Sequence, residues 1–108
     1  MRESDIQRQI LDYLAMLGVW HRRFNSGVAK MGGRFIRFGT PGLPDIMART
    51  KNTIIWIEVK QPGKYLAPEQ RRWKEEAEGF GDTFILARSV EDVSQLFERP
   101  DGPERSGK

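Results

Sequence analysis

Apolar residues in the first part of the chain recur at the spacing of a helix. Steps of three and four residues connect Ile6, Ile10, Tyr13, Leu14 and Leu17, so one apolar stripe would run along an α-helix. We expect Ser4 or Asp5 to cap this helix and Gly18 to end it. An earlier start would instead place Glu3 in the first turn. The pattern predicts an amphipathic helix packed against a core.

Short apolar stretches bounded by turn-forming residues predict five strands. They cover residues 19–25, 33–38, 45–49, 53–60 and 83–88. We expect the first two strands to form a hairpin around a mobile loop at 26–32, because glycines lie on both sides of Lys30 in that loop. The hairpin would present Arg34 and Arg37 on opposite faces of one strand.

The stretch 53–60 carries the strongest strand signal of the chain. Its run of isoleucine, tryptophan and valine indicates burial on both faces, which is typical of a central strand. A turn at 51–52 predicts that it pairs with the strand 45–49. That pairing would place Asp45 opposite Ile57 or Glu58.

Two further helices complete the predicted order α-β-β-β-β-α-β-α. One covers 68–78 with proline in its first turn, and the other follows Ser89. The order predicts the α/β class, with a single mixed sheet flanked by helices. We expect one domain over 1–98 and a disordered tail over 99–108, which is rich in proline, glycine and charge.

Composition excludes several classes of site. The 108 residues include no cysteine and one histidine, His21. Disulfides, thiolate zinc sites and cysteine nucleophiles are excluded, and a histidine-rich zinc site is disfavoured. The longest apolar run is far shorter than a membrane span, and the N-terminus lacks the apolar core of a signal peptide. We therefore expect a soluble protein of the cytoplasm.

Charge is unevenly distributed, although the net charge is only +3. The chain has no acidic residue between Asp12 and Asp45, and this stretch carries Arg22, Arg23, Lys30, Arg34 and Arg37. Such a basic run creates a local positive field that is typical of a phosphate-rich partner such as DNA. A solvated basic hairpin without a ligand is the alternative interpretation.

Three ionisable residues suggest chemistry. Glu58 and Lys60 lie two positions apart in the central strand and so share a face, and the predicted pairing brings Asp45 near them. Two converging carboxylates form an oxygen-rich site for a hard cation such as Mg²⁺ or Mn²⁺, and a lysine beside it can orient water or neutralise phosphate. The alternative is a surface salt bridge, of Glu58 with Lys60 or of Asp45 with Arg49.

Taken together, three segments resemble the VRR-NUC domain, a branch of the PD-(D/E)xK nuclease superfamily found standing alone in phages and bacteria. They are 39–46 (GTPGLPDI), 57–60 (IEVK) and 66–73 (LAPEQRRW), and the resemblance extends over roughly residues 3–97. It implies a restriction-endonuclease-like fold and a metal-dependent DNA endonuclease.

The resemblance also implies roles for individual residues. Asp45, Glu58 and the carbonyl of Val59 would bind Mg²⁺ or Mn²⁺, Lys60 would position water or stabilise the transition state, and a glutamate and a glutamine would complete the site. Those two residues correspond here to Glu3 and Gln70. We assign Asn25 and Lys64, with the five basic residues named above, to the DNA-binding surface. The family's stand-alone members suggest a homodimer acting on branched DNA such as four-way junctions.

Other functions stay open at this stage. The chain could be a nuclease that nicks or degrades other DNA, a non-catalytic nucleic-acid-binding module, or an interaction subunit of a phage or repair complex. The aromatic residues Trp20, Phe24 and Tyr65 could stack on bases, or they could belong to the core or an interface. The intact set of Asp45, Glu58 and Lys60 favours the enzyme, because carboxylates repel phosphate unless a metal intervenes.

Overall fold

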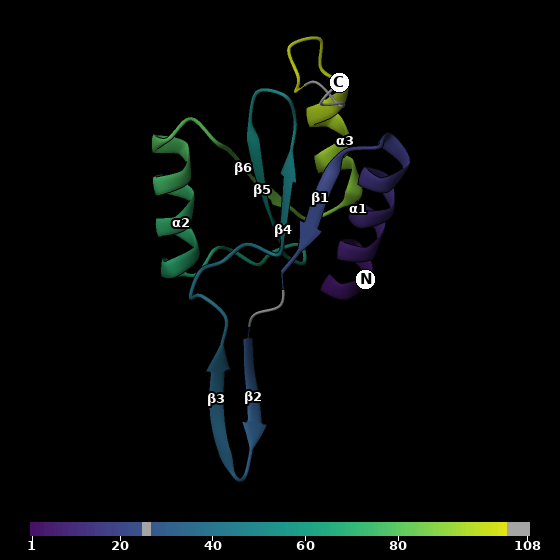
Figure 1. The fold of residues 1–108 in the computed structure, drawn as a ribbon. Coiled ribbons are helices and arrows are strands. Elements are labelled where there is room, and N and C mark those ends of the chain that lie inside the picture. The colour runs from purple at the N-terminus through teal and green to yellow at the C-terminus, as the bar shows by residue number, and fades with distance from the viewer. Residues whose placement is uncertain (25–26, 104–108) are drawn as a thin grey trace.

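The computed structural model describes residues 1–24 and 27–103, with the backbone alone at 27–31 and 35–38. Five consecutive strands follow the first helix, and a helix, a strand and a last helix complete the chain (Figure 1). The elements are α1 (Glu3–Leu17), β1 (Trp20–Arg23), β2 (Gly27–Met31), β3 (Arg34–Phe38), β4 (Ile46–Arg49), β5 (Ile54–Val59), α2 (Pro68–Gly79), β6 (Thr83–Ala87) and α3 (Val90–Glu98). The α/β class and all three helices agree with the prediction.

Four strands form a mixed sheet in the order β1-β4-β5-β6. β4 is antiparallel to both β1 and β5, whereas β5 and β6 are parallel. Strand β5 is central, as its sequence predicts. Its register sets Ile54 opposite Arg49 and Ile57 opposite Ile46. The predicted pairing is therefore confirmed, and it brings Asp45, which precedes β4, to the end of β5 that carries Glu58.

The predicted hairpin between 19–25 and 33–38 is wrong. β1 pairs with β4 in the main sheet, and β3 pairs with β2, which lies within the predicted loop. Gly32 and Gly33 have φ of 57° and 77° and form a tight turn between Met31 and Arg34. Two residues of positive φ are what a two-residue hairpin turn requires. The two glycines therefore form a two-residue hairpin turn and are not part of a long loop.

Strands β2 and β3 form an arm that projects from the body (Figure 1). Within the part of the chain that the structure describes, this arm packs on no other helix or strand. The molecule accordingly measures 50 Å in its longest direction and 30 Å and 28 Å in the others. The arm is the site of the predicted basic hairpin, with different strands from those expected.

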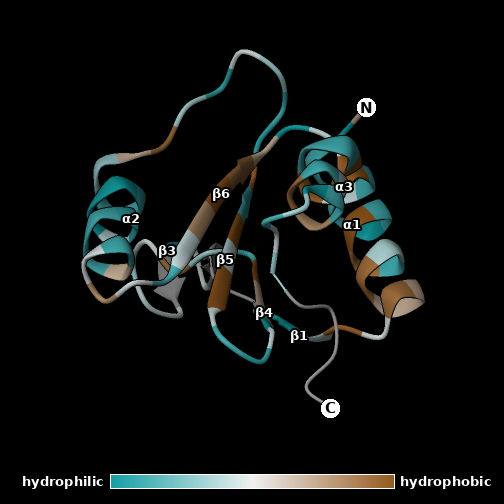
Figure 2. Cartoon of the chain, turned by 90° about the horizontal axis from the view of Figure 1, so that it is seen from above, coloured by the Kyte–Doolittle hydropathy of each residue, from teal (hydrophilic) through white to brown (hydrophobic). Residues whose placement is uncertain are grey.

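Helices cover both faces of the four-stranded sheet, as the view from above shows (Figure 2). α1 and α3 pack on each other and on one face, whereas α2 lies on the other face. The apolar stripe predicted for α1 is buried through Ile6, Ile10 and Leu14, and it meets Ile55 and Ile57 within one core. Burying an aliphatic side chain of this kind contributes about 1.5–3 kcal/mol.

Helix α1 begins earlier than a cap at Ser4 or Asp5 would allow. Arg2 is the residue before the helix, and its backbone N–H donates to the Asp5 carboxylate over 3.2 Å. Asp5 thus stabilises the first turn from within the helix, as an acidic residue in the third position does. Gly18 ends the helix with φ of 74°, as predicted. The early start places Glu3 in the first turn.

The three helices all begin at the end of the sheet from which the arm projects (Figure 1). This follows from the topology, since α2 and α3 follow the parallel strands β5 and β6 and α1 precedes β1. Helix N-termini carry partial positive charge from unpaired N–H groups. The helix ends therefore contribute partial positive charge at the end of the molecule that also carries the acidic side chains.

The predicted tail begins where α3 ends. Gly102 N–H donates to the Arg99 carbonyl over 2.9 Å, which forms a turn directly after the helix. Residues 104–108 lie outside the described part of the chain, so the disorder expected over 99–108 stays a prediction. Among the described helices, none has the length and apolar character that crossing a membrane requires.

Candidate active site

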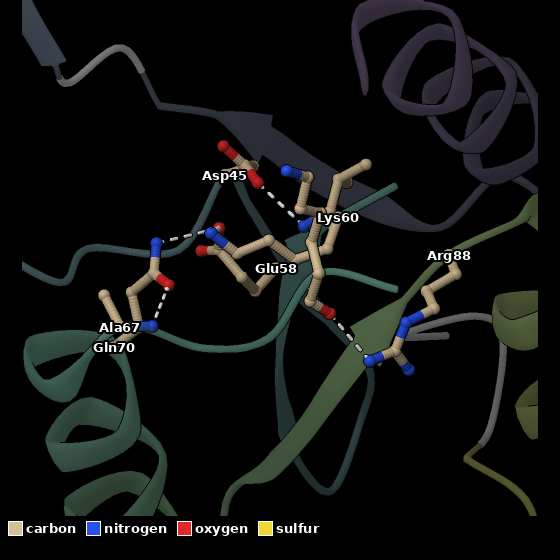
Figure 3. Close-up of polar contacts among 8 residues, drawn as sticks. Asp45, Glu58, Lys60, Ala67, Gln70 and Arg88 are labelled. Atoms are coloured by element: carbon tan, nitrogen blue, oxygen red, sulfur yellow. Dashed lines mark hydrogen bonds and ion pairs between the residues drawn. The ribbon is translucent and has the colours of Figure 1, made fainter. Parts of the chain in front are cut away.

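Asp45 and Glu58 converge where β4 begins and β5 ends (Figure 3). The Asp45 Oδ2 atom accepts a hydrogen bond of 2.7 Å from the backbone N–H of Val59. In this bond a side chain takes the place of the next backbone acceptor in the β4–β5 pairing. The bond fixes the carboxylate of Asp45 against the end of β5. Glu58 is only 4% exposed. A buried carboxylate beside a second one is costly unless a partner compensates for both charges.

The two oxygen atoms of Glu58 have different surroundings. Oε2 accepts a hydrogen bond of 3.1 Å from Gln70 Nε2 and lies 3.9 Å from Lys60 Nζ. Oε1 is buried and has no hydrogen-bond partner among the described residues. Leaving a buried carboxylate oxygen without a donor costs free energy, which a bound proton or a cation would offset.

Burial and mutual repulsion make both carboxyl groups harder to ionise. Burial raises the pKa of Glu58 from 4.5 to about 8, and the neighbouring charge of Asp45 adds to this effect. Burial also raises the pKa of Asp45, although the hydrogen bond from Val59 opposes the shift. Lys60 acts in the opposite direction on both groups. Perturbed pKa values of neighbouring carboxyl groups are typical of a functional site.

Gln70 is oriented by its place in the first turn of α2. Its Oε1 atom accepts a hydrogen bond of 2.8 Å from the backbone N–H of Ala67, the residue before the helix. The side chain therefore directs its amide N–H toward Glu58 (Figure 3). One residue thus stabilises the helix start and holds the buried carboxylate.

Two tryptophans pack α2 against the sheet close to Glu58. Trp56 lies on the same face of β5 as Glu58, and Trp73 lies three residues after Gln70 in α2. The two indole rings meet edge to face, with centroids 5.2 Å apart. Trp56 Nε1 also donates to Asp82 Oδ2 over 2.9 Å. This packing parallels the Gln70–Glu58 contact and joins the same two elements.

Glu3 reaches the site through the first turn of α1. A hollow of about 210 Å³ is lined by Glu3, Asp45 and Val59, together with Ser4, Gln7, Arg23 and Phe24. The charge of Glu3 contributes to the raised pKa of both Asp45 and Glu58. The predicted site residues thus come together from three elements, α1, β5 and α2, and from the ends of β4 and β5. They are Glu3, Asp45, Glu58, Lys60 and Gln70.

The donor set fits a hard divalent cation. Asp45 and the unpartnered Oε1 of Glu58 would supply carboxylate oxygens. Asp45 and Val59 line the hollow described above, and Glu58 lies buried next to Val59 in β5. The carbonyl of a strand residue points to the same side as its N–H, so that of Val59 is directed toward the Asp45 side. Within the described residues, no three His, Cys, Asp or Glu side chains surround a common point. A cation would therefore rest on two carboxylates, a carbonyl and water, as Mg²⁺ often does.

Of the two salt bridges considered as an alternative, the described residues form one and not the other. Lys60 and Glu58 do form an ion pair, but Glu58 is buried, so this is no solvated surface pair. Arg49 lies at the opposite end of β4 from Asp45. The acidic pair is thus held by Val59 and Gln70 rather than neutralised by arginine.

The predicted DNA-binding residues are spread over the arm, β1 and the loop before α2. Arg22 lies over the ring of Trp20 at 4.4 Å, and Arg23 Nε donates to Gln7 Oε1 over 3.0 Å. Arg34, at the arm's turn, and Lys64 are exposed. The side chains of Lys30 and Arg37 and the whole of Asn25 lie outside the described part of the structure.

Arg88 is a site neighbour that the sequence reasoning missed. Its Nη2 atom donates to the carbonyl of Lys64 over 2.8 Å, and its guanidinium lies 5.3 Å from the centre of the Tyr65 ring. It thereby ties the loop between β5 and α2 to the end of β6 (Figure 3). Its position directly after a strand that ends beside β5 was a signal that could have identified it.

Comparison with known proteins identifies the fold. A solved structure described as "VRR_NUC domain" superposes with a TM-score of 0.66 over 91% of this chain and 96% of that chain, at 23% sequence identity. No protein-family model and no curated protein matches the chain. The chain therefore has the fold of a VRR_NUC domain, which the resemblance in three short segments predicted.

Proposed function

We propose that the protein is a divalent-metal-dependent DNA endonuclease that hydrolyses phosphodiester bonds. The observation that carries the proposal is the buried Glu58 Oε1 atom, which has no donor among the described residues and lies beside a second raised-pKa carboxyl group. A bound cation would supply the missing partner. The likeness to a structure described as a VRR_NUC domain supports the same class of activity.

Each residue of the site would have a distinct task. Asp45, Glu58 and the Val59 carbonyl would hold Mg²⁺ or Mn²⁺, which polarises a phosphodiester and lowers the pKa of bound water. Lys60, whose side chain is 18% exposed, would orient the attacking water or neutralise charge that develops on the phosphate. Gln70 would keep Glu58 in place by its hydrogen bond. Glu3 would hold a water at the open side of the hollow.

The substrate we propose is branched DNA, such as a four-way junction, cut by a homodimer in the cytoplasm. An arm with Arg34 at its turn supports contact with DNA beyond the site itself. A body of this size covers little of a junction, and cutting two strands of a symmetric junction suits two sites related by a two-fold axis. A nicking activity on other DNA is the alternative within the same chemistry.

Incubation with branched, duplex and single-stranded DNA in Mg²⁺, Mn²⁺ or EDTA tests the activity. We expect metal-dependent cleavage that Lys60→Ala reduces by about 10²–10⁴-fold, with Lys51→Ala, an exposed lysine at the far end of β5, as the matched control. Absence of cleavage with either metal, or equal cleavage by Lys60→Ala, contradicts the proposal. DNA binding in EDTA without cleavage would instead indicate a non-catalytic module.

Two physical measurements test the metal and the dimer. Crystals soaked in Mn²⁺ should show anomalous density between Asp45 and Glu58. Sedimentation at micromolar concentration should show a dimer, and a monomer there would count against the proposed two-site geometry.

A further inference from the structure

A groove leads away from the acidic site along the start of α1. The hollow at Asp45 and Val59 shares Ser4, Gln7 and Arg23 with a second hollow of about 460 Å³. The second hollow continues past Arg2, Asp5, Arg8 and Leu11. Because three residues line both, the two hollows form one continuous depression.

The charge of the residues that line this groove changes from negative to positive along its length. Glu3 and Asp45 line the inner part, whereas Arg2, Arg8 and Arg23 line the outer part. Only one carboxylate, Asp5, lies among these arginines in the lining of the outer hollow. The outer part therefore carries an excess of positive charge directly beside an acidic centre.

The outer arginines are available to a ligand. Arg2 Nε and Arg8 Nη2 lie 3.6 and 3.7 Å from the two oxygens of Asp5, and their side chains are 83% and 75% exposed. Long ion pairs of such exposed groups contribute little stability. Each guanidinium keeps further N–H donors directed to solvent, and its fork-shaped set of donors matches a phosphate.

Arg23 occupies the junction between the two parts. It lies opposite Ile46, the residue after Asp45, and its Nε donates to Gln7 Oε1 over 3.0 Å. That hydrogen bond ties β1 to α1 and fixes the guanidinium at the boundary of the acidic centre. The start of α1, with its partial positive charge, forms the floor of the same boundary.

We propose that this groove binds the sugar–phosphate backbone of one DNA strand on one side of the phosphodiester held at Asp45 and Glu58. Arg23 would contact the nearest flanking phosphate, and Arg8 and Arg2 the phosphates beyond it. The proposal rests on the proposed nuclease function. Its physical reason is that carboxylates repel phosphates, so the attraction that holds the strand has to come from cations beside the centre.

The first experiment measures DNA binding without cleavage. Fluorescence anisotropy with a labelled single strand and a labelled junction is recorded in Ca²⁺ and in EDTA over a series of salt concentrations. Arg8→Ala and Arg2→Ala should each weaken binding about 3- to 10-fold and reduce the slope of log K against log salt by about one. Asp5→Asn, which retains an oxygen for the Arg2 N–H, should strengthen binding.

Arg49→Ala is the matched control, because Arg49 is an exposed arginine at the far end of β4. It removes the same charge at a distance from the groove and should change the affinity and the slope much less. Equal effects of Arg8→Ala, Arg2→Ala and Arg49→Ala would overturn the proposal, since net charge alone would then explain binding.

A second experiment locates the strand. Single neutral methylphosphonates replace successive phosphates on either side of the cut, and each substrate is tested with the wild type and with Arg8→Ala. A neutral group on one side only should abolish the effect of Arg8→Ala. If the effect persists with every substituted position, Arg8 does not contact the flanking backbone and the proposal fails.

The two proposals fail separately. Arginine-dependent binding without cleavage in any metal would retain the groove and reject the nuclease. Metal-dependent cleavage that requires Glu58 but is indifferent to Arg2 and Arg8 would retain the nuclease and reject the groove.

Discussion

Gln70 donates from Nε2 to Oε2 of Glu58 over 3.1 Å, and this contact leaves Oε1 as the oxygen without a donor among the described residues. The direction of the donation is fixed at the other end of the amide, where Oε1 of Gln70 accepts from Ala67 N–H. The start of α2 therefore determines which oxygen of Glu58 is left without a donor among the described residues, and this oxygen would face the proposed cation.

Replacement of Gln70 by alanine should affect both ends of that amide. The change removes a donor to a buried carboxylate and leaves the Ala67 N–H unpaired, so we expect a loss of about 1–3 kcal/mol of stability. Metal-dependent cleavage should fall while DNA binding in Ca²⁺ persists. Urea denaturation and cleavage rates check this, with Gln95→Ala on the exposed side of α3 as the control. Equal rates for the two variants would remove Gln70 from the site.

The raised pKa of Glu58 predicts a stability that depends on pH. Between pH 4.5 and about 8 the folded protein keeps the Glu58 proton while the unfolded chain releases it. The unfolded state then binds fewer protons, so the free energy of unfolding should fall as pH rises through this window. Glu58→Gln carries no such group and should be more stable than the wild type at about pH 8 by a few kcal/mol.

Thermal melts in EDTA at about pH 5 and about pH 8 test this difference. The difference in melting temperature between Glu58→Gln and the wild type should be larger at the higher pH. Glu75→Gln replaces an exposed glutamate of α2 and should show no such trend. A difference that is constant with pH would mean that Glu58 ionises at its ordinary pKa.

Divalent metal should reverse this penalty. A cation binds the ionised carboxylates, so Mn²⁺ has to displace the proton of Glu58 and should raise the melting temperature more at about pH 8 than at about pH 6. At a concentration about 100 times its Kd, a single bound ion adds roughly 2.7 kcal/mol. Asp45→Asn should lose this shift. A shift that Asp45→Asn retains in full would place the ion elsewhere.

Gly42 controls the distance between the Asp45 loop and α2. Its φ is +81°, and a Cβ there would collide with the backbone carbonyl of Glu69 in the first turn of α2. Gly63 has φ of +85° but open space around it. Gly63→Ala should therefore lower the free energy of unfolding by about 1 kcal/mol, from backbone strain alone. Gly42→Ala should lower it by about 2–4 kcal/mol and should also reduce cleavage activity. Urea denaturation of both variants isolates the collision, and equal losses would contradict it.

The sequence predicts the centre of this protein better than its periphery. The apolar run of β5 and the turn before it place Asp45 beside Glu58 correctly, because both signals are local and act over a few residues. The first helix and its buried stripe are also local features. The VRR-NUC resemblance adds Glu3 and Gln70, which no local pattern would have joined to the pair.

What the sequence misses depends on partners far along the chain. The stretch 27–31 contains glycine and alanine and so reads as a loop, yet it pairs with β3 because the turn at Gly32 and Gly33 aligns the two. The pairing of β1 with β4, and the contact of Arg88 with the loop before α2, join segments whose contact no short motif records. Arg2 and Arg8 share a groove with Arg23, which comes from β1, and no local pattern joins these segments.

The arm and the body of this protein form separate sheets. The backbones of β2 and β3 pair with each other and approach no other described helix or strand, so the hydrogen bonds of the four-stranded sheet do not depend on them. We therefore expect changes in the length and sequence of the arm to leave the backbone pairing around Asp45 and Glu58 intact. If the proposed function holds, exchange of the arm between related chains would be the first change to test for a new substrate preference.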